Sequence, residues 1–250
     1  MKWRVNKSGQ ITHLTMGDSP NLAWQFGMNE YAVYTVEQGV HKRSPALHYT
    51  QKDADVKEGL NFEYARMVTA TGVVRDPQLR VGVQRFWNTY EQKSENELLV
   101  TIEREYTDKV TVFDDSVCFL CTPGWYNLFK LYSPEGEYYN GYYVPRNNPV
   151  RVLHSEEAQQ IIFDTKKTLE EQNLFSKAIV EGWGEIWGNN YGLRFDILEF
   201  SKGEFPIQRI VQPKNRSYVE YEFQFDLLGE RQAGDIQRLK LLITGLVAQR

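Results

Sequence analysis

The chain has 250 residues, of which 41% are hydrophobic and 25% charged, as in a globular protein rather than a disordered or fibrous one. Its formal net charge of -4 argues against a broad basic surface, so we do not expect nucleic acid as a partner. The apolar runs are too short to cross a bilayer, and no apolar region follows the charged N-terminal residues as in a secretory signal. We therefore expect cytoplasmic synthesis and no membrane partner.

Aromatic residues are abundant at 14%, with 15 Tyr, 13 Phe and 6 Trp. Large flat side chains pack the strands of sheet-rich proteins, and they are also enriched at protein interfaces. The composition therefore favours a β-rich core and leaves an aromatic binding surface as the alternative.

The first half of the chain predicts a series of short antiparallel strands. Trp3 and Val5 precede a turn at residues 6–9, and a second strand-like segment runs from Ile11 to Met16, which indicates a hairpin. Further strand-like segments lie at 22–26, 31–36, 60–74, 81–90, 98–106, 110–113, 116–121, 124–132 and 137–144. Their spacing of roughly ten residues is typical of a sandwich or barrel. Residues 39–58 are polar and without a period, so we expect a long exposed loop there.

The pattern changes after Pro145–Pro149, and we place a domain boundary between residues 149 and 150. Helices are predicted at 155–169 and 174–187, where apolar residues recur at three- and four-residue steps. Strands at 191–200, 205–211 and 218–228 are expected to form a meander. A last helix is predicted from Arg231 to Val247, because Ile236, Leu239, Leu242, Ile243 and Leu246 would share one helical face.

The predicted fold class is therefore α+β. An antiparallel β-rich domain, either a sandwich or a barrel, is expected at 1–149, followed by a small α+β domain of order ααβββα at 150–250.

No motif for catalysis or metal binding is present. Cys118 and Cys121 form a lone C-x-x-C in a strand-like run, without the second pair or the histidines that a zinc site needs, and we expect them to be small buried side chains. His41 and His48 lack the helical spacing of a metalloprotease pair. There is no G-x-S-x-G, Walker or G-x-G-x-x-G sequence. We therefore predict no catalytic residue, no metal and no cofactor.

Two acidic patterns and one glycine pattern have simpler structural explanations. Glu103 and Glu105 would share one face of a strand and predict an exposed charged surface rather than a glycosidase pair. The step from Glu199 to Lys202 is one residue too long for the acidic motif of metal-dependent nucleases. Residues 182–185, Gly-Trp-Gly-Glu, indicate packing at the end of a helix.

The most suggestive surface residues are the tyrosines of the segment YYNGYY, namely Tyr138, Tyr139, Tyr142 and Tyr143. Tyrosines on both faces of an edge hairpin can stack on sugars or anchor a protein partner, because they offer a large contact area at a low cost in rotamer entropy. The alternative is that their rings simply cover the sheet.

The segment Ser217–Glu230, SYVEYEFQFDLLGE, runs into the predicted helix at Arg231. Over about residues 217–247 this strand, glycine turn and helix resemble the last part of tail-terminator and neck proteins of tailed bacteriophages. The resemblance implies a small α+β subunit that assembles into rings, with no catalytic residues to carry over.

Three functions stay open. The first is a non-enzymatic structural subunit of a larger assembly, a bacteriophage tail or neck component located in the virion, with protein partners in a homo-oligomer or hetero-assembly. The second is a β-sandwich binding module that takes carbohydrate or peptide through Tyr138 to Tyr143. The third is an enzyme with a divergent active site, which would require a cleft with convergent carboxylates or histidines.

Overall fold

The computed structural model describes residues 1–37, 40–59, 66–75, 82–122, 128–131, 151–152, 161–162, 177–180, 182–188, 190–201, 206–211 and 220–248. All regular secondary structure in these ranges is β-strand. No helix within them is long and apolar enough to span a membrane. The predicted α+β class is therefore wrong, and the described part of the chain is an all-β structure of two antiparallel sheets.

The strands are β1 (Lys2–Val5), β2 (Ile11–Thr15), β3 (Ala23–Glu37), β4 (Val40–Gly59), β5 (Met67–Arg75), β6 (Gly82–Ser94), β7 (Glu97–Tyr106), β8 (Val110–Cys121), β9 (Leu128–Leu131), β10 (Arg151–Val152), β11 (Ile161–Ile162), β12 (Lys177–Val180), β13 (Trp183–Gly188), β14 (Tyr191–Phe200), β15 (Ile207–Val211), β16 (Glu220–Arg231) and β17 (Ile236–Val247).

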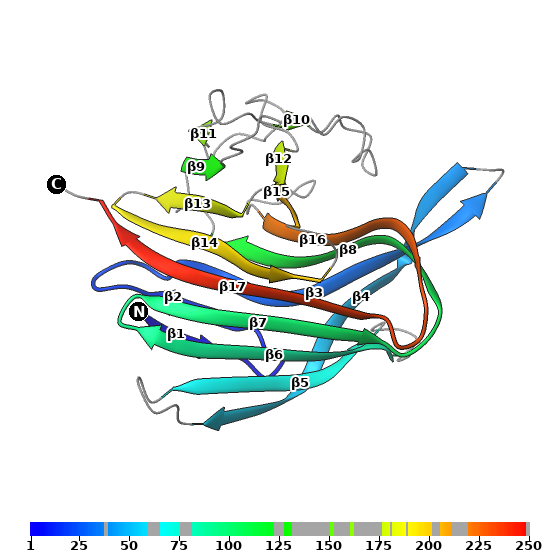
Figure 1. Cartoon of the computed structure of the whole chain (residues 1–250), viewed down its shortest axis with the longest axis horizontal. Helices are drawn as coiled ribbons and strands as arrows, with labels where there is room; N and C mark the ends of the chain where they lie inside the picture. Colours follow the sequence, from blue (N-terminus) through cyan, green and yellow to red (C-terminus); the bar gives the residue numbers. More distant parts are fainter. Residues whose placement is uncertain are drawn as a thin grey trace.

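The two sheets are named here after one of their strands. The β7 sheet has the order β5, β6, β7, β17, β14, β13, β9 and β11, and the β8 sheet has the order β3, β8, β16, β15, β12 and β10, where the two-residue β10 is parallel to β12. Strand β4 joins them, because it pairs with β3 from Val40 to Thr50 and with β5 from Thr50 to Gly59. Figure 1 shows β6, β7, β17 and β14 side by side along the long axis of the molecule.

The core lies between the sheets, because every second side chain of the long strands points inward. In β7 the buried residues are Leu98, Val100, Ile102, Arg104 and Tyr106. Phe195 of β14 connects the two layers. Its ring centroid lies 5.3 Å from that of Phe119 in β8 and 5.2 Å from that of Tyr221 in β16, against which it stacks.

The predicted N-terminal hairpin is confirmed as β1 and β2, and a buried network attaches its turn to β6. Gly9 has φ 76°, and a Cβ there would lie 2.6 Å from the Cβ of Ala70, so the turn requires glycine. The Tyr90 hydroxyl donates to the Gly9 carbonyl at 2.7 Å. The Asn88 Nδ2 donates to the Tyr90 hydroxyl at 3.2 Å and to the Gly27 carbonyl at 3.0 Å.

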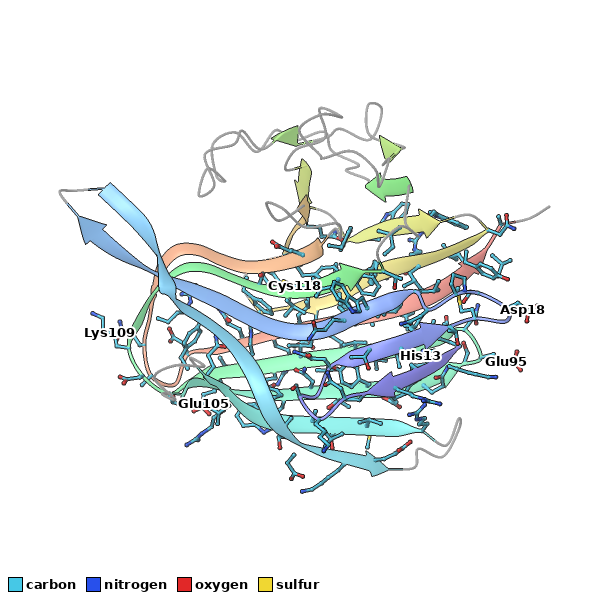
Figure 2. All side chains as sticks on the ribbon, turned by 180° about the vertical axis from the view of Figure 1, so that it is seen from behind. His13, Asp18, Glu95, Glu105, Lys109 and Cys118 are labelled. Atoms are coloured by element: carbon cyan, nitrogen blue, oxygen red, sulfur yellow. The ribbon has the colours of Figure 1, made fainter. Side chains whose placement is uncertain are left out.

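Figure 2 shows Asp18 and Glu95 at one end of the sandwich and Glu105 and Lys109 at the other. At the second end the turn between β16 and β17 packs on the end of β7. There the Tyr106 amide donates to the Asp235 carbonyl at 2.9 Å, and the Gly234 amide donates to the Tyr106 carbonyl at 2.8 Å.

Two of the predicted helices are strands. Within the segment 174–187 the described residues form β12 and all of β13 except Gly188, and the segment 231–247 contains the end of β16 and all of β17. The inward residues of β17 follow a period of two, with Leu239, Leu241 and Ile243 fully buried. Its outward face also carries leucines, and apolar residues on both faces imitate a helical pattern. The helix expected at 155–169 lies outside the described residues apart from β11.

The expected loop at 39–58 is also wrong, because this segment forms β4. Side chains from Ala54 to Lys57 alternate between half-buried and exposed. Backbone pairing with β3 and β5 makes this polar segment a strand, because strand propensity depends on the structural context.

Most predicted strands of the first half are confirmed. The segments 22–26 and 31–36 form one strand, β3, and 110–113 and 116–121 form β8. Residues 137–144 lie outside the described part. The three strands after residue 190 exist as β14, β15 and β16, but β14 pairs with β13 and β17 rather than with β15.

The domain boundary between residues 149 and 150 stays a prediction. Strands from both sides of it share the sheets, because β8 pairs with β16 and β7 pairs with β17.

Tyr90 should make this fold less stable at alkaline pH. Burial raises the pKa of its phenol, while the hydrogen bond with Asn88 lowers it by a smaller amount. The unfolded chain therefore loses this proton first, and stability should fall as the pH rises above the ordinary tyrosine value of about 10. In Tyr90→Phe this part of the decline should disappear, at a cost of about 1 kcal/mol at neutral pH from the lost hydrogen bond to Gly9.

Urea unfolding from pH 8 to 11 measures this effect, with Tyr191→Phe as the control at a half-buried tyrosine. An unchanged alkaline slope in Tyr90→Phe would contradict the prediction.

Candidate functional site

The outer face of the β7 sheet carries the best-formed cluster of aromatic and charged side chains in the described part of the chain. Pairing between strands arranges this face in rows. One row runs from Thr71 in β5 through Trp87 in β6 and Glu103 in β7 to Arg238 in β17. Opposed residues on one face of an antiparallel sheet lie about 5 Å apart, so neighbours in a row contact each other.

The first group on this face, called here the tryptophan cluster, lies on β13 and β14 and consists of Trp183, Glu185, Trp187, Arg194 and Asp196. The Arg194 guanidinium lies 3.8 Å from the ring centroid of Trp183. Its Nε donates to both carboxylate oxygens of Asp196, at 2.9 and 3.0 Å. The Trp187 Nε1 donates to Glu185 Oε2 at 2.9 Å, and Arg194 Nη1 lies 3.6 Å from Glu185 Oε1. Arg194 thus contacts Trp183 directly and is connected to Trp187 through the Glu185 carboxylate.

Glycine at position 192 lets the Trp187 ring lie flat on the sheet. Gly192 pairs with Trp187 across β13 and β14, and a Cβ there would lie 2.5 to 2.8 Å from the indole ring atoms Cδ2, Cε2 and Cε3. Real side chains do not approach this closely, so any other residue would displace the indole. Trp187 is partly exposed, and one face of its ring rests on Gly192.

The second group, called here the arginine bridge, consists of Arg238 with Glu103 and Glu199. Arg238 Nε donates to Glu103 Oε2 at 2.7 Å, Nη2 contacts the same oxygen, and Nη1 donates to Glu199 Oε1 at 3.1 Å. Hydrogen bonding to Glu103 and then to Glu199 raises the pKa of the Arg238 guanidinium. Trp87, 37% exposed, lies next to Glu103 in the same row.

The ion pairs on this face fix the orientation of the arginine and carboxylate side chains more than they stabilise the fold. Arg238 and Glu199 keep 44% and 46% of their side chains exposed, and exposed pairs contribute about 0 to 1 kcal/mol. A guanidinium held by two carboxylates has a fixed orientation, and so do the remaining lone pairs of those carboxylates. The face therefore offers partly exposed aromatic rings beside hydrogen-bonding groups of fixed direction.

A second polar cluster lies inside the sandwich, near the end of the core that contains Tyr106. Arg104 is fully buried, its Cζ lies 4.1 Å from the Phe225 ring centroid, and its Nη1 donates to the Ser116 carbonyl at 3.4 Å. Gln84 and Gln237 are fully buried as well, and their amide groups make no hydrogen bond within the described part of the chain. Because this cluster is enclosed between the sheets, we assign it to the core rather than to a binding surface.

The predicted site residues fall partly outside the described structure. Tyr138, Tyr139, Tyr142 and Tyr143 all do, so their role stays a prediction. Glu103 and Glu105 share an outward face as expected. The Glu105 Oε2 atom lies 3.8 Å from Arg85 Nη1.

The structure describes only some of the cysteine and histidine side chains. Cys118 is buried as expected, whereas the side chain of Cys121 is not described. Among the histidines, only the side chain of His13 is described. The described residues contain no group of three or more His, Cys, Asp or Glu side chains that could hold a metal ion.

The sequence analysis does not predict the tryptophan cluster, because it assigns residues 174–187 to a helix. The alternation Trp183, Glu185, Trp187, set against Gly184 and Ile186, is the signal that could have identified it. Read with a period of two, that pattern places both tryptophans on one strand face.

Neither the scan against protein family models nor the search of curated proteins finds a match for this chain. The resemblance to phage tail-terminator and neck proteins therefore stays a prediction, and the helix that it implied is strand β17. Functional inference depends on the site itself.

The buried amides of the interior cluster provide a stability test. A buried amide without a hydrogen bond costs about 1 to 3 kcal/mol, so the nearly isosteric change Gln237→Met should raise the free energy of unfolding by about 1 kcal/mol. Gln208→Met is the matched control, because the buried Gln208 Oε1 accepts a hydrogen bond from the Tyr221 hydroxyl at 2.6 Å. That variant should be destabilised. Urea titration of both measures the difference, and a loss of stability in Gln237→Met would show that its amide is hydrogen-bonded in solution.

Proposed function

We propose that this chain is a non-catalytic carbohydrate-binding protein and that the outer face of the β7 sheet takes the ligand. The observation that carries the proposal is the tryptophan cluster, in which two partly exposed indoles are held by Arg194 and its carboxylates. Sugar rings present apolar C–H faces bordered by hydroxyls. Aromatic rings bind the C–H faces, and fixed carboxylate and guanidinium groups bind the hydroxyls.

A carbohydrate fits this face better than a peptide does. Peptides that bind sheets add a strand at an edge and use its unpaired backbone groups. In β14 and β17 the backbone is paired on both sides, so only side chains are available to a ligand. The positively charged Arg194 guanidinium lies 3.8 Å from the Trp183 ring centroid, and its charge argues against a cage for a cationic ligand.

The cluster favours binding over catalysis. Glu103, Glu199 and Asp196 each bond to an arginine, which fixes the direction of their remaining lone pairs. A glycosidase needs two carboxyl groups that flank the scissile bond of its substrate. Carboxylates held by arginines suit the role of hydrogen-bond acceptors for hydroxyl groups.

Removal of an indole tests the proposal. Native affinity electrophoresis against soluble neutral polysaccharides should retard the wild type, and Trp183→Ala and Trp187→Ala should each lose at least about tenfold in affinity. Trp24→Ala is the control, because Trp24 is 48% exposed but lies on β3 of the other sheet. All variants should retain wild-type circular dichroism.

Two results would contradict the proposal: no retardation by any polysaccharide, or equal losses in Trp24→Ala and Trp187→Ala. Light scattering on the same samples tests the assembly hypothesis separately, because a ring subunit would show a discrete multiple of 29.3 kDa.

A further inference from the structure

We infer that the outer face binds a linear, uncharged glycan that extends from the tryptophan cluster across the arginine bridge to Trp87. This inference depends on the proposed function and adds the length and charge of the ligand. It is carried by a third exposed indole on the same face, by the polar groups between the indoles, and by the charge of that face.

Trp87 supplies an aromatic contact distant from the tryptophan cluster. It lies on β6, whereas the cluster lies on β13 and β14, and strands β7 and β17 run between them. With neighbouring strands about 4.8 Å apart, the four steps from β6 to β13 span about 19 Å across the sheet. A single sugar ring cannot contact both places, so a ligand that uses them is an extended chain.

Hydrogen-bonding groups lie on the surface between the aromatic contacts, beside the outward Leu99 and Leu242. Arg238, Glu103 and Glu199 lie on the three strands between β6 and β13, with their polar groups bonded to one another. Thr89 and Thr101 face each other in the neighbouring row, which Lys240 continues on β17. Side chains of this kind can bond to the hydroxyls along a glycan without blocking its path.

The charge of the face argues against an acidic ligand. Its described carboxylates, on the outward side of β6, β7, β13 and β14, are Glu91, Glu97, Glu103, Glu105, Glu185, Asp196 and Glu199. Its basic side chains are Arg85, Lys93, Arg194, Arg238 and Lys240. Carboxylates therefore predominate, and the two site arginines are already bonded to them. A uronate or sulfated chain would be repelled, whereas neutral hydroxyls meet ionised acceptors.

Calorimetry with β-1,4-linked glucose oligomers from disaccharide to hexasaccharide tests the inference. Equatorial hydroxyls give these chains flat apolar faces that suit the indoles. The wild type should gain at least about tenfold in affinity along the series, as expected for one added aromatic anchor. Trp87→Ala should lose that gain, while Trp87→Phe should retain part of it.

The outcomes separate this inference from the proposed function. If Trp183→Ala and Trp187→Ala abolish binding but Trp87→Ala has no effect on the hexasaccharide, the extended ligand is wrong and the carbohydrate site stands. If polygalacturonate binds with the same affinity as the neutral hexasaccharide, the inference that the ligand is uncharged is wrong. If no oligomer of the series binds, the inference fails, and failure of every polysaccharide in the electrophoresis panel would remove the proposed function as well.

Discussion

The register of β17 between β7 and β14 determines both faces of the β7 sheet. The pairing runs from Ile236 opposite Glu105 to Thr244 opposite Glu97 on one side, and along β14 on the other. A shift of one residue would turn Leu239 and Ile243 outward and bury Arg238. Burial of the apolar row therefore holds Arg238 between Glu103 and Glu199, and the hydrophobic core sets the geometry of the surface that we assign to ligand binding.

The candidate site depends on rigid strands rather than on loops. Trp183 and Trp187 point to the same side because they are four residues apart on β13. Arg194 on the paired strand contacts the Trp183 ring and the Glu185 carboxylate, which accepts a hydrogen bond from Trp187. Gly192 completes the arrangement by leaving room for the flat indole. Groups placed on paired strands keep their relative positions better than groups on loops, and such preorganisation lowers the entropy lost on binding.

Sequence patterns predicted strands well where one face is buried and the other is polar. The alternation in ELLVTIEREY predicts β7, including the outward position of Glu103 and Glu105. Sequence patterns fail where a strand has apolar residues on both faces, as in β17, or crosses between sheets, as in β4. In both cases long-range pairing decides the structure, and a local pattern does not report it.

The same limit applies to the candidate site. The tryptophan cluster combines residues of two paired strands with Gly192, and its arginine is assigned to it only once the β13 and β14 register is known. Trp87 and Arg238 are separated by 151 positions along the chain but lie in one row. Composition indicated an excess of aromatic residues but not the sheet face on which they gather.

The most direct test of the account is a nuclear magnetic resonance titration of the indole N–H signals, assigned through single Trp→Phe variants of the 6 tryptophans. On addition of the neutral hexasaccharide the signals of Trp87, Trp183 and Trp187 should shift together. Those of the buried Trp3 and of Trp24 on β3 should stay in place. A shift confined to Trp24, or no shift in Trp183 and Trp187 at saturation, would contradict a binding site on the outer face of the β7 sheet.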